Sequence, residues 1–126
     1  MKQIINTTNA PAAIGPYSQA VLANGILYIS GQIPVDPSRS VLAEGIEAST
    51  HQVMKNLQAI LTEAGMTFNN VVKATIFLKS MDDFAVMNDI YASYFEGGNF
   101  PARETVQVSC LPKNVDVEIS MIAHQD

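Results

Sequence analysis

The chain has 126 residues and a formal net charge of −5, with 48% hydrophobic and 15% charged residues. A chain of this length forms one domain with a real core, so we expect a single domain over residues 1–126, and the low charge leaves apolar surface for an oligomeric interface. The seven basic residues are scattered and form no stripe that could follow a phosphate backbone, which argues against nucleic acid as a partner.

Three short strands are predicted in the first third of the chain, at residues 3–5, 17–23 and 26–31. Asn24 and Gly25 separate the second strand from the third and form a dipeptide that is favoured in two-residue hairpin turns. Pro34, Asp36 and Pro37 then end the third strand. The beginning of the chain therefore reads as a meander.

An amphipathic helix is predicted over residues 46–64, because its apolar side chains recur at helical spacing and Gly65 stands where a left-handed terminator belongs. A strand follows, with a period of two that marks one strongly buried face. The residues expected on that face are Val72, Ala74, Ile76 and Leu78.

A second helix is predicted to follow Ser80, which with Asp83 resembles a capping arrangement, and to end before Gly97. Its apolar stripe consists of Phe84, Met87, Tyr91, Tyr94 and Phe95, and Asn88 lies on the stripe. Two last strands, at residues 104–109 and 115–123, are joined by a turn around 112–114. The order βββαβαββ predicts an α+β domain with a single mixed sheet and both helices on one face.

The two last strands carry an arginine and a glutamate, and we expect these strands to be adjacent. Side-chain alternation predicts that Arg103 shares the less apolar face of its strand with Thr105, that Glu118 lies on the less apolar face of the next strand, and that Cys110 belongs to the core. Two interpretations remain open. Arg103 and Glu118 either pair with each other, or Arg103 binds the carboxylate of a small acid while Glu118 handles a proton.

Other kinds of site are disfavoured by residue spacing. The chain has no GxSxG elbow, no glycine-rich phosphate loop and no CxxC pair, and His51 and His124 lack partners at metal-ligand spacing. The single cysteine cannot form an internal disulfide, the amino terminus lacks the apolar segment of a signal peptide, and no run approaches the ~18 apolar residues of a membrane span. We therefore expect a cytoplasmic protein without a metal site.

Several separated motifs resemble the Rid family, also called YjgF-like or reactive intermediate deaminase proteins, and in particular its RidA subgroup. These motifs are GPYSQA, SGQIPVDP, NDIY, FPAR and LPKNVDVEI, in that order. The resemblance implies a chorismate-mutase-like fold and a homotrimer with sites between subunits. It also implies hydrolysis of 2-imino and enamine acids, such as 2-iminobutanoate and 2-iminopropanoate, to 2-keto acids and ammonia, without a cofactor.

The resemblance also implies roles for individual residues. Arg103 would hold the substrate carboxylate, Glu118 would hold the attacking water, and Tyr17 would close the cleft from the next subunit. The remaining substrate-binding residues would be Ser30, Gly31, Asn88 and Thr105, with Gly31 and Thr105 acting through backbone N–H groups. The residues alone favour another interpretation, in which Tyr17 packs on a turn beside Pro16 and Asn88 is a solvated helix position.

The chain departs from the family pattern at Thr105, where many RidA members have a cysteine, so thiol-based regulation is not expected. Imine hydrolysis is less affected, since threonine still supplies a backbone N–H. Two other functions stay open: a regulatory module that binds 2-keto acids without turnover, and a nuclease or translation inhibitor. The net charge of −5 disfavours the nuclease.

Overall fold

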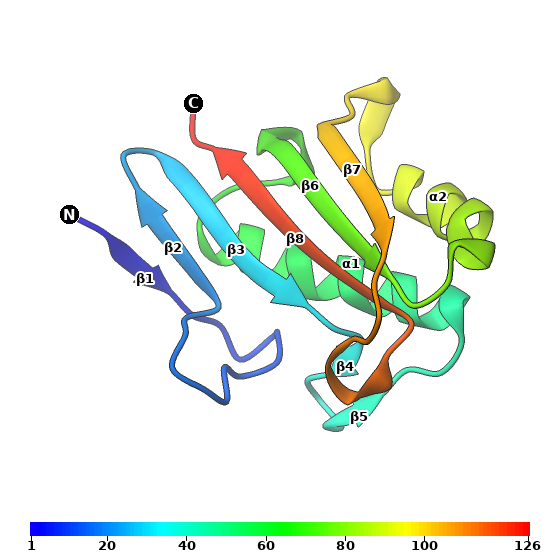
Figure 1. Ribbon diagram of the computed structural model, residues 1–126. Helices are drawn as coiled ribbons and strands as arrows, with labels where there is room; N and C mark the ends of the chain where they lie inside the picture. Colours follow the sequence, from blue (N-terminus) through cyan, green and yellow to red (C-terminus); the bar gives the residue numbers. More distant parts are fainter.

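A mixed sheet of six strands forms the centre of the fold, in the order β1-β2-β3-β8-β6-β7. The computed structural model describes all 126 residues. Its strands are β1 (Gln3–Ile5), β2 (Ala20–Ala23), β3 (Ile26–Gln32), β6 (Val71–Leu78), β7 (Ala102–Gln107) and β8 (Val117–His124). Helices α1 (Ile46–Glu63) and α2 (Phe84–Ala92) both lie behind this sheet (Figure 1). The predicted α+β architecture is confirmed.

The hydrophobic core lies between the sheet and α1. Apolar side chains of α1 such as Leu57 and Ile60 are fully buried against alternate residues of the central strands, including Ile76 and Ile119. The helix ends where expected, because Gly65 adopts a left-handed conformation with φ of 75° and the Met66 N–H donates to the Leu61 carbonyl. The prediction of this helix is confirmed.

The N-terminal meander forms with one change at the start of β2. Asn24 and Gly25 both have positive φ, 51° and 76°, as the hairpin turn requires. The predicted strand over residues 17–23, however, begins only at Ala20. The reason is that Gln19 turns inward at 2% exposure and bonds the backbone of Thr7 and other loop residues, which holds the N-terminal loop in place. A short ribbon of β4 (Val35–Asp36) and β5 (Val41–Leu42) was not predicted.

Strand β6 has an irregularity that changes the predicted face of one residue. The pairing register with β8 shifts between Val71 and Lys73, so that Val71 is buried and Val72 is 51% exposed. The expectation that Val72 joins Ala74 on the buried face is therefore wrong. The rest of the alternation, from Ala74 to Leu78, is confirmed.

The second helix is shorter than the sequence pattern suggested. Ser80 caps a short 3-10 turn (Met81–Asp83) by accepting from the Asp82 N–H, and α2 then ends at Ala92. Tyr94 and Phe95 lie beyond the helix, because the chain turns before the 3-10 segment Glu96–Gly98, yet Phe95 is still buried. The apolar stripe thus reflects a helix followed by a turn.

The two strands that carry Arg103 and Glu118 are not neighbours. Strand β7 pairs in parallel with β6 at the edge of the sheet, whereas β8 pairs with β6 on its other side. The α2 crossover returns the chain parallel to β6 and leaves β7 at the edge. The prediction of adjacent strands is wrong, because β6 separates them.

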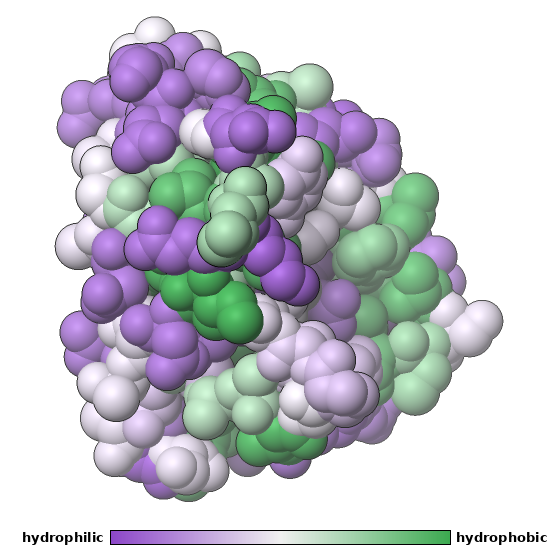
Figure 2. Space-filling model, turned by 90° about the vertical axis from the view of Figure 1, so that its left-hand side faces the viewer, coloured by the Kyte–Doolittle hydropathy of each residue, from purple (hydrophilic) through white to green (hydrophobic).

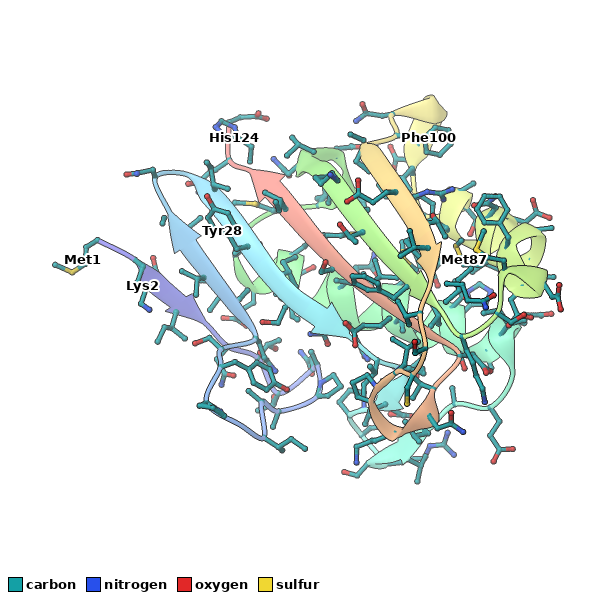
Figure 3. The ribbon with its side chains drawn as sticks, in the orientation of Figure 1. Met1, Lys2, Tyr28, Met87, Phe100 and His124 are labelled. Carbon is teal, nitrogen blue, oxygen red and sulfur yellow. The ribbon has the colours of Figure 1, made fainter.

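The face of the sheet opposite the helices is not covered by any element of the chain. It carries exposed apolar side chains that include Tyr28 and Val106, at 47% and 44% exposure. Tyr28 is visible on this front face in Figure 3. In Figure 2, which looks from the β1 edge, the same face forms the right-hand margin, where hydrophobic surface is exposed. None of the helices has the length and hydropathy needed to cross a membrane.

Candidate active site

Arg103 lies on the helix-covered face of β7. Its partner in the register is Ala74, a fully buried residue of β6, so both residues face the helices. The guanidinium carbon lies 5.0 Å from the ring centre of Tyr91 and 5.8 Å from that of Phe84, both on α2. Arg103 forms no salt bridge, so its charge is available to a ligand.

A cavity of about 400 Å³ adjoins this guanidinium between α2 and the start of β7. Its lining consists of Asn88, Asp89, Tyr91, Ala92, Phe100, Pro101 and Arg103. Two oxygens of the lining, Asn88 Oδ1 and Tyr91 Oη, are buried and lack any hydrogen-bond partner, and so does Thr105 Oγ1, two residues after Arg103 on β7. Because buried polar atoms are nearly always paired, these oxygens indicate a place where a ligand or water belongs.

The backbone of β7 offers a further donor at the same place. The Val108 N–H donates to the Leu78 carbonyl of β6, and in a parallel pair alternate residues of a strand make these bonds. The N–H groups of Arg103 and Thr105 therefore point to the free edge of the sheet. A carboxylate at this edge would meet a guanidinium and at least one backbone donor.

Glu118 lies on the opposite, open face of the sheet. It pairs with Phe77 of β6, while its neighbours Val117 and Ile119 point to the core and are fully buried. Glu118 is half-buried and makes no salt bridge, and this burial raises the pKa of its carboxyl above the usual value. A carboxyl in such surroundings is better suited to accept a proton than an ordinary surface glutamate.

Three of the other predicted residues lie on or beside the strand next to Glu118. A side chain at position 31 would collide with the Glu118 carboxylate, since a Cβ built on Gly31 would lie 2.8 Å from Glu118 Cδ. Ser30 Oγ donates to the Ser18 carbonyl at 2.6 Å, which holds the loop that contains Tyr17 alongside. Tyr17 itself is 54% exposed.

The predicted site residues therefore form two groups, which one chain does not bring together. The first, which we call the arginine group, contains Arg103, Asn88 and Thr105; the second, the glutamate group, contains Glu118, Gly31, Ser30 and Tyr17. The partners of Arg103 and Glu118 on β6, Ala74 and Phe77, are an odd number of positions apart and so face opposite sides. Arg103 shares its face of β7 with Thr105, as expected, but this face points toward the helices whereas Glu118 points away from them. Direct pairing of Arg103 with Glu118 within the chain is therefore wrong.

Cys110 also differs from its prediction. It was expected in the core but is exposed, because β7 ends at Gln107 and the alternation of faces does not continue to position 110. The aromatic residues around Arg103 were missed as site residues. Tyr91 follows Asn88 by one helical turn, which was the signal that could have identified it.

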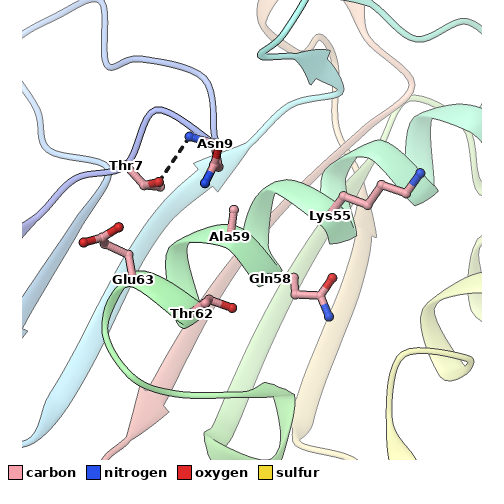
Figure 4. Close-up of a pocket in the computed structure, with 7 residues that line it drawn as sticks. All are labelled: Thr7, Asn9, Lys55, Gln58, Ala59, Thr62 and Glu63. Atoms are coloured by element: carbon pink, nitrogen blue, oxygen red, sulfur yellow. Dashed lines mark hydrogen bonds between the residues drawn. The ribbon is translucent and has the colours of Figure 1, made fainter.

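A second cavity, of about 430 Å³, lies between the N-terminal loop and α1 (Figure 4). Its lining is mostly polar: Thr7, Asn9, Lys55, Gln58, Ala59, Thr62 and Glu63. None of these residues has a buried polar atom without a partner, and Thr7 Oγ1 accepts from the Asn9 N–H. This cavity contains no predicted site residue and lacks the unpaired atoms that mark the Arg103 cavity.

Comparisons with known proteins agree with the sequence motifs. The family model described as endoribonuclease L-PSP matches residues 7–125. The chain is 50% identical to the mouse protein named 2-iminobutanoate/2-iminopropanoate deaminase, over 99% of this chain and 93% of the mouse protein. It is 52% identical to the putative regulator AldR of Lactococcus lactis, over 96% of each chain. A crystal structure of the Rid family protein YyfA from Yersinia pestis superposes with a TM-score of 0.96 at 54% identity, covering 98% of this chain and 99% of the other.

Proposed function

The chain belongs to the Rid family, and we propose that it hydrolyses reactive 2-imino and enamine acids, such as 2-iminobutanoate and 2-iminopropanoate, to 2-keto acids and ammonia. The observation that carries this proposal is the unpaired Arg103 guanidinium beside a cavity with unsatisfied buried oxygens. A guanidinium binds a carboxylate through two parallel N–H bonds, and every proposed substrate carries a carboxylate. The deaminase name of the mouse relative supports the same substrate class.

The proposed site is shared between two copies of the chain, with the arginine group from one copy and the glutamate group from the next. This arrangement is needed because Arg103 and Glu118 lie on opposite faces of one sheet. The open face with Glu118 also exposes apolar side chains, which a second copy would cover. We propose a homotrimer, in which each copy gives one group to each neighbour.

The chemistry needs few groups, because a protonated imine is already a strong electrophile. Arg103 holds the carboxylate, with Asn88 and the Thr105 backbone N–H beside it. Water attacks the imine carbon while Glu118 accepts a proton from it, which gives a carbinolamine. Glu118 then returns the proton to the nitrogen; as the carbon–nitrogen bond breaks, Glu118 takes the hydroxyl proton, ammonia leaves and the 2-keto acid remains. The reaction consumes no cofactor.

The remaining residues take supporting roles in this proposal. Tyr17, which is exposed in the chain, closes the cleft from the neighbouring copy, and Ser30 fixes the loop that carries it. Gly31 leaves room for the Glu118 carboxylate.

The experiment is to generate imines in place with an amino acid oxidase and to trap them with semicarbazide. Purified protein should compete with the trap, lower the yield of semicarbazone and speed the release of 2-keto acid. Assembled protein that leaves the semicarbazone yield at the level of buffer would contradict the proposal.

A regulatory role without turnover is the second candidate, because the Lactococcus lactis relative is named a putative regulator. In that case Arg103 binds a 2-keto acid and Glu118 takes no part in chemistry. Glu118→Ala separates the two functions: it should abolish deamination and spare binding of 2-oxobutanoate if the chain is an enzyme.

A further inference from the structure

The Arg103 side chain is held by two aromatic rings rather than by a carboxylate. Its guanidinium carbon lies 5.0 Å from the Tyr91 ring centre and 5.8 Å from that of Phe84. These distances are within the range in which a cation is attracted to an aromatic face. The aromatic contact leaves the edge of the guanidinium, with its N–H groups, free for another partner.

The Tyr91 ring is itself fixed by the aromatic cluster behind it. It packs against Phe95 with ring centres 4.8 Å apart, and Phe95 packs in turn against Phe68 and Phe100 at 5.4 Å and 5.9 Å. Tyr91 is only 3% exposed, so most of its ring is in contact with other side chains.

Helix α2 is also tied to the strand that carries Arg103. The Gln107 side chain at the end of β7 accepts from the Met81 N–H in the turn that leads into α2. This bond and the ring contacts place the Arg103 guanidinium beside α2 within a single chain, before any ligand binds.

We propose that Tyr91 and Phe84 are positioning residues that hold the Arg103 guanidinium ready for a carboxylate. This inference deepens the proposed function, since it assigns residues that act through the carboxylate anchor. A free arginine side chain loses much rotamer freedom when it binds, and a side chain already held between rings loses less. Tyr91 stays an uncharged phenol over the working range, because burial raises its pKa to about 12.

Calorimetry with 2-oxobutanoate tests the proposal without any need for turnover. Tyr91→Leu and Phe84→Leu should each weaken binding about tenfold. Tyr91→Phe keeps the ring but removes the buried, unpaired Oη, so it should lose less affinity than Tyr91→Leu, and its remaining loss measures any hydrogen bond between Oη and the ligand. Phe68→Leu removes a buried ring that reaches Arg103 only through Phe95 and Tyr91, so it should weaken binding less than Tyr91→Leu does. Phe84 is only partly buried, so its variant is the one that should fold even if Tyr91→Leu does not.

A second measurement reports the stacking directly. The Arg103 Nε–H resonance, identified by its loss in Arg103→Lys, should be shifted upfield by the ring current in the wild type and in Tyr91→Phe, and should move back in Tyr91→Leu or Phe84→Leu. Unchanged affinity in a folded Phe84→Leu or Tyr91→Leu protein would overturn the positioning role. A wild type that shows the ring-current shift but does not bind 2-oxobutanoate would instead overturn the proposed function, so the two failures are distinguishable.

Discussion

The arginine group and the glutamate group differ in how completely one chain builds them. Around Arg103 the chain supplies two aromatic rings, a cavity and three buried oxygens that await partners. Around Glu118 it supplies a glycine that leaves room, an exposed Tyr17 on a loop held by Ser30, and a half-buried position on an uncovered sheet face. A single chain therefore positions the Arg103 guanidinium, whereas it leaves the Glu118 carboxylate on a sheet face that only a second copy would bury.

The difference follows from what each charge requires. A guanidinium keeps its proton in any surroundings, so it needs only a fixed orientation, which the rings of α2 can provide. A carboxylate that acts as a base must be partly withdrawn from water, and an open sheet face gives only part of that burial. On this account a second copy completes the glutamate group much more than the arginine group.

The largest effect is expected at Glu118. Glu118→Gln removes the base and keeps the shape, so kcat should fall about 10²- to 10⁴-fold while the affinity for 2-oxobutanoate stays close to that of the wild type. Steady-state kinetics and calorimetry on the same preparation measure both values. An unchanged kcat would show that Glu118 does not act as a base, and it would favour the regulatory function.

The arginine group should respond in the opposite way. Arg103→Lys keeps the charge but loses the two-pronged geometry and the stacking, so binding of 2-oxobutanoate should weaken about 10- to 100-fold. Titration calorimetry gives this ratio. Full affinity in the lysine variant would show that charge alone suffices and that the aromatic support of Arg103 is irrelevant.

A smaller effect is expected from Gly31→Ala. The new methyl group would press on the Glu118 side chain and displace its carboxylate, and we expect kcat to fall about tenfold with little change in ligand affinity. The control is thermal stability, which Gly31→Ala should lower in the wild type but not in the Glu118→Ala background, where there is no carboxylate for the methyl group to press on. Equal losses in both backgrounds would mean that Gly31 matters for some reason other than room for Glu118.

The smallest effect concerns stability and pH. The raised pKa of Glu118 means that the folded state binds more protons than the unfolded state, so stability should fall as pH rises from the ordinary value of 4.5 through the folded pKa. At pH 7 the Glu118→Gln variant should therefore be more stable than the wild type and unfold at a higher temperature. The gain in the free energy of unfolding should be less than about 1 kcal/mol, because the carboxyl is only half-buried. Thermal unfolding at pH 7 and below pH 4 measures the difference, which should vanish at the lower pH; a gap that persists there would contradict the assignment.

Sequence patterns predicted the face of a side chain where the alternation along its own strand sets it, and they missed the face where pairing with a distant strand sets it. The buried face of β8 and the side of Glu118 followed from the strict alternation of Val117, Ile119 and Met121 with polar residues. The side of Arg103 did not follow, because β7 is an edge strand with no clear apolar face, and its orientation is set by parallel pairing with β6 after the α2 crossover.

The aromatic support of Arg103 was hidden for a related reason. The helical spacing of Tyr91 and Phe84 predicts core residues of α2. Their contact with the Arg103 guanidinium depends on the packing of α2 beside β7, which the sequence pattern does not show. The motifs did identify Arg103, Asn88 and Thr105 as candidates; Arg103 and Asn88 line one cavity, and Thr105 follows Arg103 on β7 with a buried, unpaired hydroxyl. That Arg103 and Glu118 lie on opposite faces could be seen only from the register in which β7 and β8 pair with β6.

Mixing two inactive variants tests the shared site most directly. Arg103→Ala and Glu118→Ala proteins should each be inactive alone, but unfolding and refolding them together at equal amounts should restore about a quarter of the wild-type sites, because some sites then take an intact arginine group from one copy and an intact glutamate group from another. Deaminase activity near that level in the mixture is the result that the account predicts. A mixture that exchanges subunits and stays as inactive as its components would contradict it.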